Sequence, residues 1–284
     1  MTQGSACVPA GDPRQVIGGG RDAAGAYSNG GVEMRRAEVV AVVLAAAAIL
    51  AAPCLAVDEV FQQTYPLPAG GSFELQNVNG SVHVSAWERE EVEVYAKKTA
   101  RQDQSDLKRV EIEVEARANE VSVQTRYPQD GGVEVYVEYH IRVPQRVQLR
   151  RVATVNGDVR VFGVEAAGEL RSVNGDIEVY DSAGGMSART TNGNLRLELR
   201  QLEASGPVTL ETVNGSVLLA VPAGTGAELE VRSLNGDFRS ELPVTLYSSK
   251  GPREFRARLG ASGTPLRIRT VNGGIRVVAL RAGV

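Results

Sequence analysis

The sequence has little of the side-chain chemistry that most enzymes and nucleic-acid-binding proteins use. Aromatic residues make up 5% of its 284 residues, with one Trp, and there are two His and two Cys. Single strands of nucleic acid bind on aromatic side chains, and a phosphate backbone needs a surplus of Lys and Arg. Because the formal net charge is −3, we do not expect nucleic acid as a partner.

Recognisable catalytic and metal-binding motifs are also lacking. The sequence has no G-x-S-x-G turn, Walker loop, H-E-x-x-H helix or dinucleotide fingerprint. His83 and His140 fall on the polar faces of expected strands, without a metal-ligand spacing. We therefore predict that the protein is not an enzyme and has neither a cofactor nor a metal site.

Residues 34–56 have the pattern of a secretory signal peptide. Two Arg residues follow Met34, then comes an apolar stretch from Val39 to Ala52, and small residues occupy the −3 and −1 places of a cleavage site after Ala56. A membrane helix needs about 20 apolar residues, so a retained anchor is the lesser alternative. A lipoprotein signal at Cys54 is disfavoured because Pro53 precedes it.

Residues 1–33 are polar and rich in Gly, without apolar periodicity. We interpret them as a disordered leader or as an upstream extension of a chain that starts at Met34. Cys7 and Cys54 both precede the expected cleavage point, so we expect no disulfide in the mature chain. Cleavage would also remove the apolar stretch, so we expect no transmembrane span. We expect an exported protein that is periplasmic, on the outer surface or extracellular.

What the sequence does have is a repeated Asn-Gly dipeptide after an apolar residue or Thr. The Asn residues are Asn79, Asn156, Asn174, Asn192, Asn214, Asn235 and Asn272. From Asn156 onward their spacings are 18, 18, 22, 21 and 37 residues, and the last spacing is about two periods of roughly 20 residues. Such a period is typical of a repeat architecture.

Other positions repeat in step with the Asn residues. A hydroxyl lies two residues earlier in six copies: Thr154, Ser172, Thr190, Thr212, Ser233 and Thr270. Asn77 takes that place before Asn79. Apolar residues recur four places before each Asn and three places after it, and in most copies five places after it. The alternation after each Asn-Gly predicts a strand with one buried face.

Two architectures explain this pattern. Each Asn-Gly is either a type I′ hairpin turn or a corner between stacked coils of a β-solenoid. A hairpin would place Arg189 opposite Arg196, and opposed like charges are destabilising. Stacked coils would instead place Arg160, Glu178 and Arg196 in a row of alternating sign, and would align the Asn amides and the hydroxyls into hydrogen-bonded ladders. We favour the solenoid.

Residues 57–150 are strand-rich but less regular. Long alternating runs cover Glu91–Lys97 and Val133–Val143. We predict an all-β protein, with an antiparallel β capping region over residues 57–150 and a β-solenoid of Asn-Gly repeats over residues 151–284. Val244–Leu259 interrupts the period and is expected to be an insertion or a degenerate coil at the far end.

The motif T-V-N-G-D-V-x-V at Thr154–Val161, nearly repeated at Ser172–Val179, resembles a large bacterial family described as a "putative adhesin" or β-strand-repeat domain of unknown function. The resemblance covers roughly residues 73–278. It implies an exported or membrane-anchored envelope protein, and it assigns no catalytic residues.

The Asp residues that follow three of the Asn-Gly pairs are the remaining candidates for chemistry. Asp158 and Asp176 would be neighbours on stacked coils, where a carboxylate pair could bind calcium or hydrolyse a sugar. Asn194 and Ser216 fill the same place in the next two copies, which favours a turn role for Asp158, Asp176 and Asp237.

Three functions follow from these observations. We expect a non-enzymatic envelope protein that presents a rigid β-surface to an envelope protein or to a cell-wall or surface glycan. The alternatives are a carbohydrate-active β-helix enzyme and a regulatory partner in envelope stress sensing.

Overall fold

A computed structural model describes residues 58–280, except positions 102, 130, 203–205, 252 and 262. The expected leader, the signal peptide and both Cys residues lie outside the described residues. Among the residues described, no helix is long and apolar enough to cross a membrane. The helical part of this region is a single 3-10 element, η1 (Gln104–Arg109).

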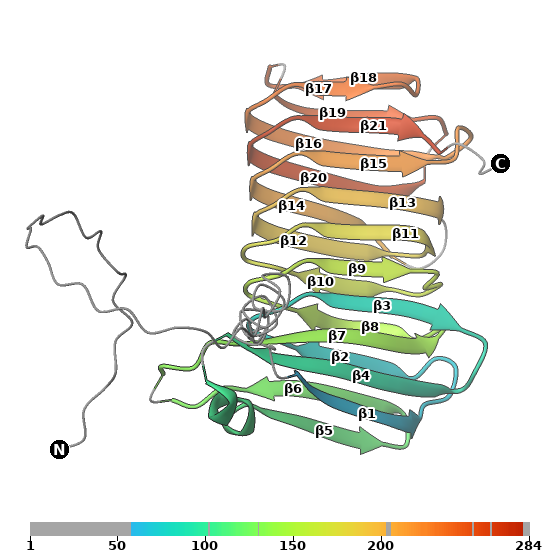
Figure 1. Ribbon diagram of the computed structural model, residues 1–284. Helices are drawn as coiled ribbons and strands as arrows, with labels where there is room; N and C mark the ends of the chain where they lie inside the picture. Colours follow the sequence, from blue (N-terminus) through green and yellow to red (C-terminus); the bar gives the residue numbers. More distant parts are fainter. Residues whose placement is uncertain are drawn as a thin grey trace, which may run out of the picture. The chain divides into compact units, whose positions relative to one another are not determined.

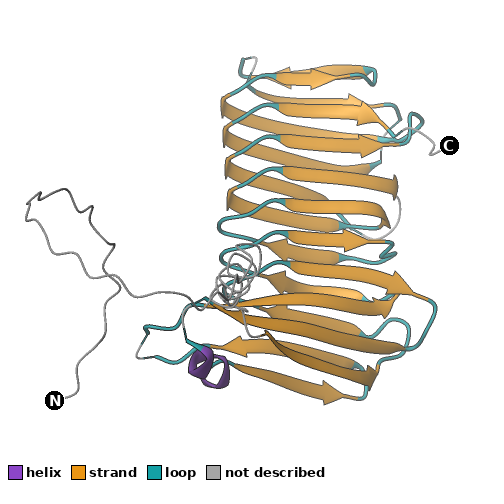
Figure 2. Ribbon diagram, viewed as in Figure 1, coloured by secondary structure: helices purple, strands orange, loops and turns teal. Residues whose placement is uncertain are grey.

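The strands form two sheets, which Figures 1 and 2 show as stacked rungs. Sheet A has the order β1 (Asp58–Pro66), β4 (Glu91–Ala100), β7 (Val135–Pro144), β3 (Val82–Trp87), β9 (Val159–Phe162), β11 (Ile177–Ala183), β13 (Leu195–Gln201), β15 (Val217–Val221), β21 (Ile275–Ala279) and β17 (Phe238–Ser240). Sheet B has the order β18 (Val244–Ser249), β19 (Glu254–Leu259), β16 (Ala227–Asn235), β20 (Thr264–Asn272), β14 (Val208–Asn214), β12 (Met186–Asn192), β10 (Gly168–Arg171), β8 (Gln148–Ala153), β2 (Ser72–Gln76), β6 (Glu120–Arg126) and β5 (Glu111–Arg117). The expectation of an all-β protein is confirmed.

Each Asn-Gly joins a strand of sheet B to a strand of sheet A. Asn192-Gly193, for example, lies between β12 in sheet B and β13 in sheet A. The hairpin alternative is therefore wrong, because the flanking strands do not pair with each other. Instead, equivalent positions of successive copies pair in parallel, as in β11 with β13. Arg189 faces Arg171 and Glu211 rather than Arg196.

The last two layers do not follow the order of the chain. Strands β20 and β21, the last along the chain, lie between the layer of β14 and β15 and the layer of β16 and β17. The segment between β17 and β20 forms the antiparallel hairpin β18–β19, which ends sheet B. This hairpin accounts for the spacing of 37 residues between Asn235 and Asn272, and it covers the edge of β16.

The region before the repeats is mixed rather than antiparallel, so that part of the fold prediction is wrong. Strands β2 and β3 pair in parallel with β8 and β9. Strands β6 and β7 add one more parallel layer beyond them. Antiparallel pairing in this region is confined to the end of the stack, where β4 pairs with β1 and β7 and β5 pairs with β6. These strands close the end of the stack where an open parallel edge would invite further pairing.

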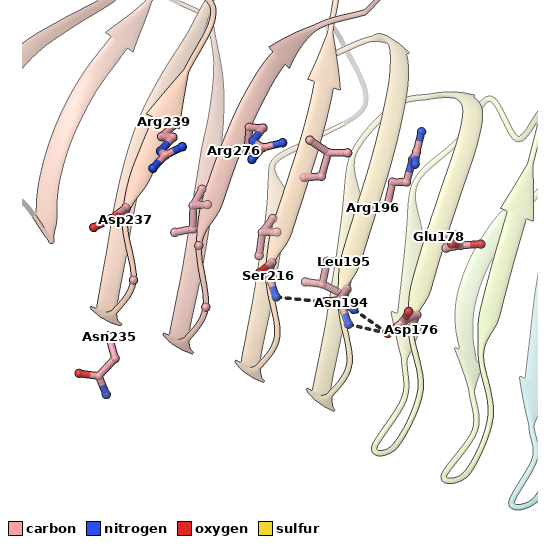
Figure 3. A pocket seen from close by; sticks show the side chains of 16 residues that line it. Asp176, Glu178, Asn194, Leu195, Arg196, Ser216, Asn235, Asp237, Arg239 and Arg276 are labelled. Carbon is pink, nitrogen blue, oxygen red and sulfur yellow. Dashed lines mark hydrogen bonds between the residues drawn. The ribbon is translucent and has the colours of Figure 1, made fainter.

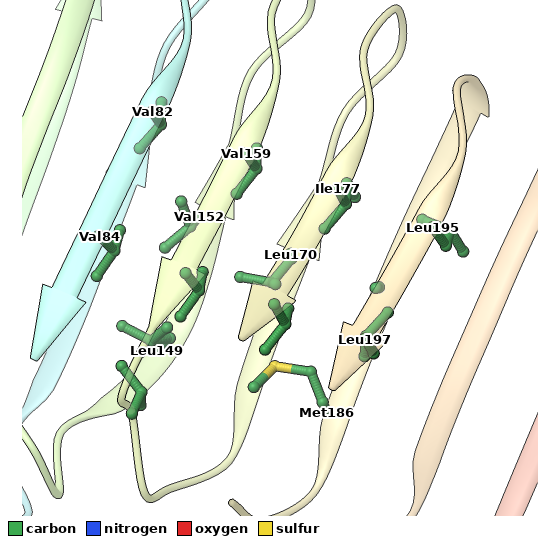
Figure 4. Close-up of a cluster of buried hydrophobic side chains, with 14 of the residues drawn as sticks. Val82, Val84, Leu149, Val152, Val159, Leu170, Ile177, Met186, Leu195 and Leu197 are labelled. Atoms are coloured by element: carbon green, nitrogen blue, oxygen red, sulfur yellow. The ribbon is translucent and has the colours of Figure 1, made fainter. Parts of the chain in front are cut away.

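The core lies between the two sheets, where alternate side chains of each strand meet. Figure 4 shows Val159, Ile177 and Leu195 of sheet A beside Leu170 and Met186 of sheet B. The apolar positions predicted from the repeat are buried, and Phe238 is the half-buried exception. A fully buried side chain of this size contributes about 1.5–3 kcal/mol, so repeated burial is the main force holding the layers together.

Candidate functional site

The Asn side chains lie in one hydrogen-bonded column along the corner between the sheets. The amide of Asn174 donates to the side-chain oxygen of Asn156 at 2.8 Å, and the amide of Asn192 donates to Asn174 at 2.8 Å. The other bonds of the column run from Asn156 to Asn79, Asn214 to Asn192, Asn272 to Asn214 and Asn235 to Asn272, at 2.7–2.9 Å. We call this arrangement the Asn column.

The repeated hydroxyls are buried behind the column, but they do not bond to one another. Thr190 donates to the carbonyl of Gly175 at 2.9 Å, and Ser172 donates to the carbonyl of Gly157 at 2.9 Å. Thr154, Thr212 and Thr270 do the same at 2.9–3.1 Å. The hydroxyls therefore do not form the expected ladder among themselves: five bond to a carbonyl of the adjacent layer, and Ser233 bonds to the Gly236 carbonyl of its own corner.

Gly is required in the dipeptide because the layers approach closely. A Cβ on Gly175 would lie 2.0 Å from the carbonyl oxygen of Gly157, and one on Gly193 would lie 2.1 Å from that of Gly175. The same clash recurs at the other glycines of the dipeptide, at 1.9–2.2 Å. Close contact between layers, and not only a permissive backbone, therefore requires these glycines.

The Asp residues after Asn-Gly bond to the backbone. The Asp158 carboxylate accepts from the backbone N–H of Asp176 at 2.9 Å, and Asp176 accepts from that of Asn194 at 2.7 Å. Asn194 continues the series with the N–H of Ser216 at 3.0 Å. These bonds run to the backbone of the adjacent layer, 18 residues away along the chain, rather than to nearby backbone as in a local turn. The described region contains no group of three His, Cys, Asp or Glu residues able to hold a metal ion.

Exposed apolar side chains accompany the Asn column. The residue between the hydroxyl and the Asn points outward, and Val155, Val173, Val213 and Leu234 are 38%, 41%, 40% and 61% exposed. Together with the Asn column they form what we call the corner surface. Sequence reasoning recorded these apolar residues but missed their exposure, although the alternation with the buried hydroxyls could have revealed it.

The outer face of sheet A has the expected row of alternating charge. Glu178 lies in register with Arg160 on one side and Arg196 on the other. The Arg160 guanidinium donates to Glu178 at 2.7 Å, and this bond raises the pKa of Arg160. Stacked copies therefore also pair charges across layers.

The two His residues meet on the same face, near the N-terminal end of the stack. The rings of His83 and His140 stack with centroids 4.9 Å apart. Glu138 lies 3.8 Å from His83 and 3.3 Å from His140. Burial lowers the pKa of His83, and the nearby His140 and Arg160 lower it further. The sequence had placed both His residues on polar strand faces, but it gave no sign of their contact.

Together these features define an all-β repeat protein in which polar side chains are aligned between layers. The chain belongs to the Toastrack DUF4097 family, whose model matches residues 70–278. The resemblance to adhesin-like β-repeat proteins is thereby confirmed. Comparison with curated proteins finds no match.

Solved structures give distant likenesses. A "putative cell adhesion protein" from Clostridium sporogenes has 12% identity and a TM-score of 0.39, covering 78% of this chain and 100% of that one. A "putative adhesin" from Bacteroides fragilis has 11% identity and a TM-score of 0.34, covering 78% and 97%. A "putative lipid binding protein" from Parabacteroides distasonis has 6% identity and a TM-score of 0.33, covering 79% and 97%.

Proposed function

We propose that this protein is a non-enzymatic, exported envelope protein that presents a rigid β-repeat surface for adhesion to a protein or glycan of the cell envelope. The signal-peptide pattern of residues 34–56 supports export. The stack is interpreted as a β-solenoid of Asn-Gly repeats over residues 151–284 that follows an N-terminal β region over residues 57–150. The resemblance of the repeated motif to exported or membrane-anchored envelope proteins supports an envelope role.

The corner surface is the observation that carries the proposal. Each inner Asn of the column is bonded to the layers above and below it, so the column holds the corner in a fixed geometry. The exposed Val155, Val173 and Val213 lie beside it, and Thr191 takes the same place in the layer between Val173 and Val213. A row of amide groups with apolar side chains beside it in several layers favours contact with an extended partner, because neighbouring layers offer similar groups.

The carbohydrate-enzyme alternative has less support. It needs several carboxylates that converge beside a groove. Asp158 and Asp176 each accept a backbone N–H of the adjacent layer, which leaves them in a structural role.

Retention on envelope fractions tests the proposal. The variant V173E/V213E places charge on the corner surface without touching the core, since both side chains are about 40% exposed. The matched control is L246E, which changes a 62% exposed side chain on β18 in the same way. We expect wild type and L246E to be retained on cell-wall and envelope fractions and V173E/V213E to be released. No retention of wild type at any ionic strength, or equal retention of all three proteins, would contradict the proposal.

A further inference from the structure

A hollow of about 710 Å³ opens on the outer face of sheet A near its C-terminal end. Figure 3 shows the guanidinium groups of Arg196, Arg276 and Arg239 projecting from neighbouring strands of this face. Leu218 lies in the same row, between Arg196 and Arg276. Nothing in the proposed adhesion at the corner surface uses these residues.

Arg239 and Arg276 depart from the alternation of positive and negative charge that the earlier layers of this row show. They lie directly opposite each other on the parallel strands β17 and β21. Earlier in the row, Arg160 and Arg196 flank Glu178 instead. Like charges in direct opposition are destabilising, so this end of the row carries a cost that the preceding layers avoid.

Neither Arg239 nor Arg276 is neutralised within the described part of the chain, where no carboxylate lies within ion-pair distance of them. The equivalent Arg160 pairs with Asp158, two residues earlier, at 3.2 Å. Arg239 also has an Asp two residues earlier, but the Asp237 carboxylate points away from it in Figure 3. Arg196, by contrast, bonds to Glu198 at 2.7 Å. Two exposed guanidinium groups thus remain available to an outside anion.

The distribution of charge along the sequence also makes this end of the protein more positive than the rest. Residues 231–284 contain ten Lys and Arg and three Asp and Glu, a net charge of +7, whereas residues 1–230 carry −10. The hollow lies among the strands of the basic segment and those just before it. A cationic region on an otherwise acidic protein attracts anions and steers their approach.

The other end of the hollow is acidic, which limits the ligands that fit. Asp176 and Glu178 line it there, with Asp176 bonded to the backbone N–H of Asn194 and Glu178 bonded to Arg160. A densely charged polyanion would meet repulsion at that end. A chain with acidic groups spaced by neutral sugar units would meet Arg239 and Arg276 with one group and the remaining surface with polar hydroxyls.

We propose that Arg239 and Arg276 bind a carboxylate or phosphate group of an acidic polysaccharide. Each planar guanidinium can donate two parallel hydrogen bonds to such a group. The apolar Leu218 beside them offers a surface for the face of a sugar ring. This inference rests on the proposed function, and it names the chemical class of one ligand at a second place on the same envelope protein.

Binding to defined polymers tests the inference. The full chain is titrated with hyaluronate, whose carboxylates alternate with neutral sugar units, with a sugar-phosphate polymer that has neutral sugars between its phosphates, and with dextran as the neutral control. We expect wild type to bind at least one acidic polymer, with salt-dependent affinity, and not to bind dextran. The variant R239Q/R276Q should bind about tenfold or more weakly. The matched control R160Q, at the same position of an earlier layer, should bind like wild type.

Thermal unfolding of the same variants excludes a merely structural role. Because R239Q/R276Q removes a repulsion, its melting temperature should equal or exceed that of wild type. Equal polymer affinity in R239Q/R276Q and wild type, an equal loss in R160Q, or no binding by wild type would each overturn the inference. Because retention is assigned to the corner surface, wild type that is retained on envelope fractions but binds no acidic polymer would overturn the inference and leave the proposed function intact. Polymer binding through the two Arg residues without retention on any envelope fraction would keep the inference and contradict the proposed function.

Discussion

Each inner Asn of the column both donates and accepts one side-chain hydrogen bond, whereas an end residue makes one. Asn174 donates to Asn156 and accepts from Asn192, but Asn79 only accepts from Asn156. These amides are exposed, so water partly replaces a lost bond and each is worth about 0.5–1.5 kcal/mol. The column stabilises the stack through the number of its bonds rather than through any single bond.

The substitution Asn174→Ala should therefore lower the free energy of unfolding by about 1–2 kcal/mol, because it removes two bonds. Asn79→Ala is the matched control, since the same substitution at the end of the column removes one. Its expected cost is about half as large. Urea denaturation followed by circular dichroism measures both values. Equal costs for the two variants would show that the column does not act through these bonds.

The glycine of the dipeptide has a different role, which is to let layers touch. Gly175→Ala would place a methyl group 2.0 Å from the Gly157 carbonyl oxygen, so two backbones would have to separate. We expect a loss of more than about 3 kcal/mol, or no soluble folded protein. Gly224→Ala is the control, because no atom lies within 4 Å of the added methyl. Thermal melts measure the stability of the two variants. A G175A protein as stable as G224A would contradict the close packing of the layers.

The His pair predicts a pH dependence. The pKa of His83 is lowered from 6.5 by burial and by nearby positive charge, so the unfolded chain binds more protons than the folded one just below pH 6.5. Stability should then fall as pH decreases from 6.5. His83→Gln should flatten the plot of melting temperature against pH between about pH 7 and 5. His140→Gln removes one cause of the lowered His83 pKa, so it should flatten the plot of melting temperature against pH only in part. An unchanged slope in H83Q would assign the dependence to other groups.

At the scale of elements, the alternation of apolar residues was enough to predict strands, their buried faces and the Asn-Gly corners. Burial of Val159 and Ile177 follows directly from the period of two. The layer formed by β6 and β7 was missed because it lacks Asn-Gly. Its signal was Thr125, a buried hydroxyl in register with the place of Asn77 and preceded by alternating valines. That weak pattern could not be separated from an ordinary antiparallel strand.

The inserted position of the last layer could not be predicted either. The copies around Asn235 and Asn272 have the same dipeptide, a hydroxyl two places earlier, and apolar residues four places before and three places after the Asn. Both orders would therefore satisfy the repeat pattern equally well. The order is decided by long-range packing, in which β16 must pair with the β18–β19 hairpin on one side and with β20 on the other.

This topology predicts an unusual pattern of hydrogen exchange. Strand β20 (Thr264–Asn272) is close to the C-terminal end of the chain but pairs on both sides, with β14 and β16. Its amides should exchange more slowly than those of β18 (Val244–Ser249), which pairs only with β19. Hydrogen exchange followed by mass spectrometry of the two peptides measures this. Faster exchange in β20 than in β18 would contradict the inserted layer.

At the scale of the whole molecule, the layers make one continuous stack whose two sheets share a single buried core. The charge is unevenly distributed along the sequence, with +7 in residues 231–284 and −10 before them. The Asn column runs through the Asn-Gly layers, and exposed Val155, Val173, Val213 and Leu234 lie beside it, whereas the cationic hollow occurs at one end. A molecule of this kind can touch an extended partner along its length and hold a charged group near one end.

A crystal structure of the exported protein tests the central claim, which is that equivalent Asn side chains bond from layer to layer. We predict amide-to-oxygen contacts of 2.7–2.9 Å throughout the column, in the order Asn214, Asn272, Asn235 at its C-terminal end. Asn side chains that point apart into solvent, or Asn235 bonded directly to Asn214, would contradict the account.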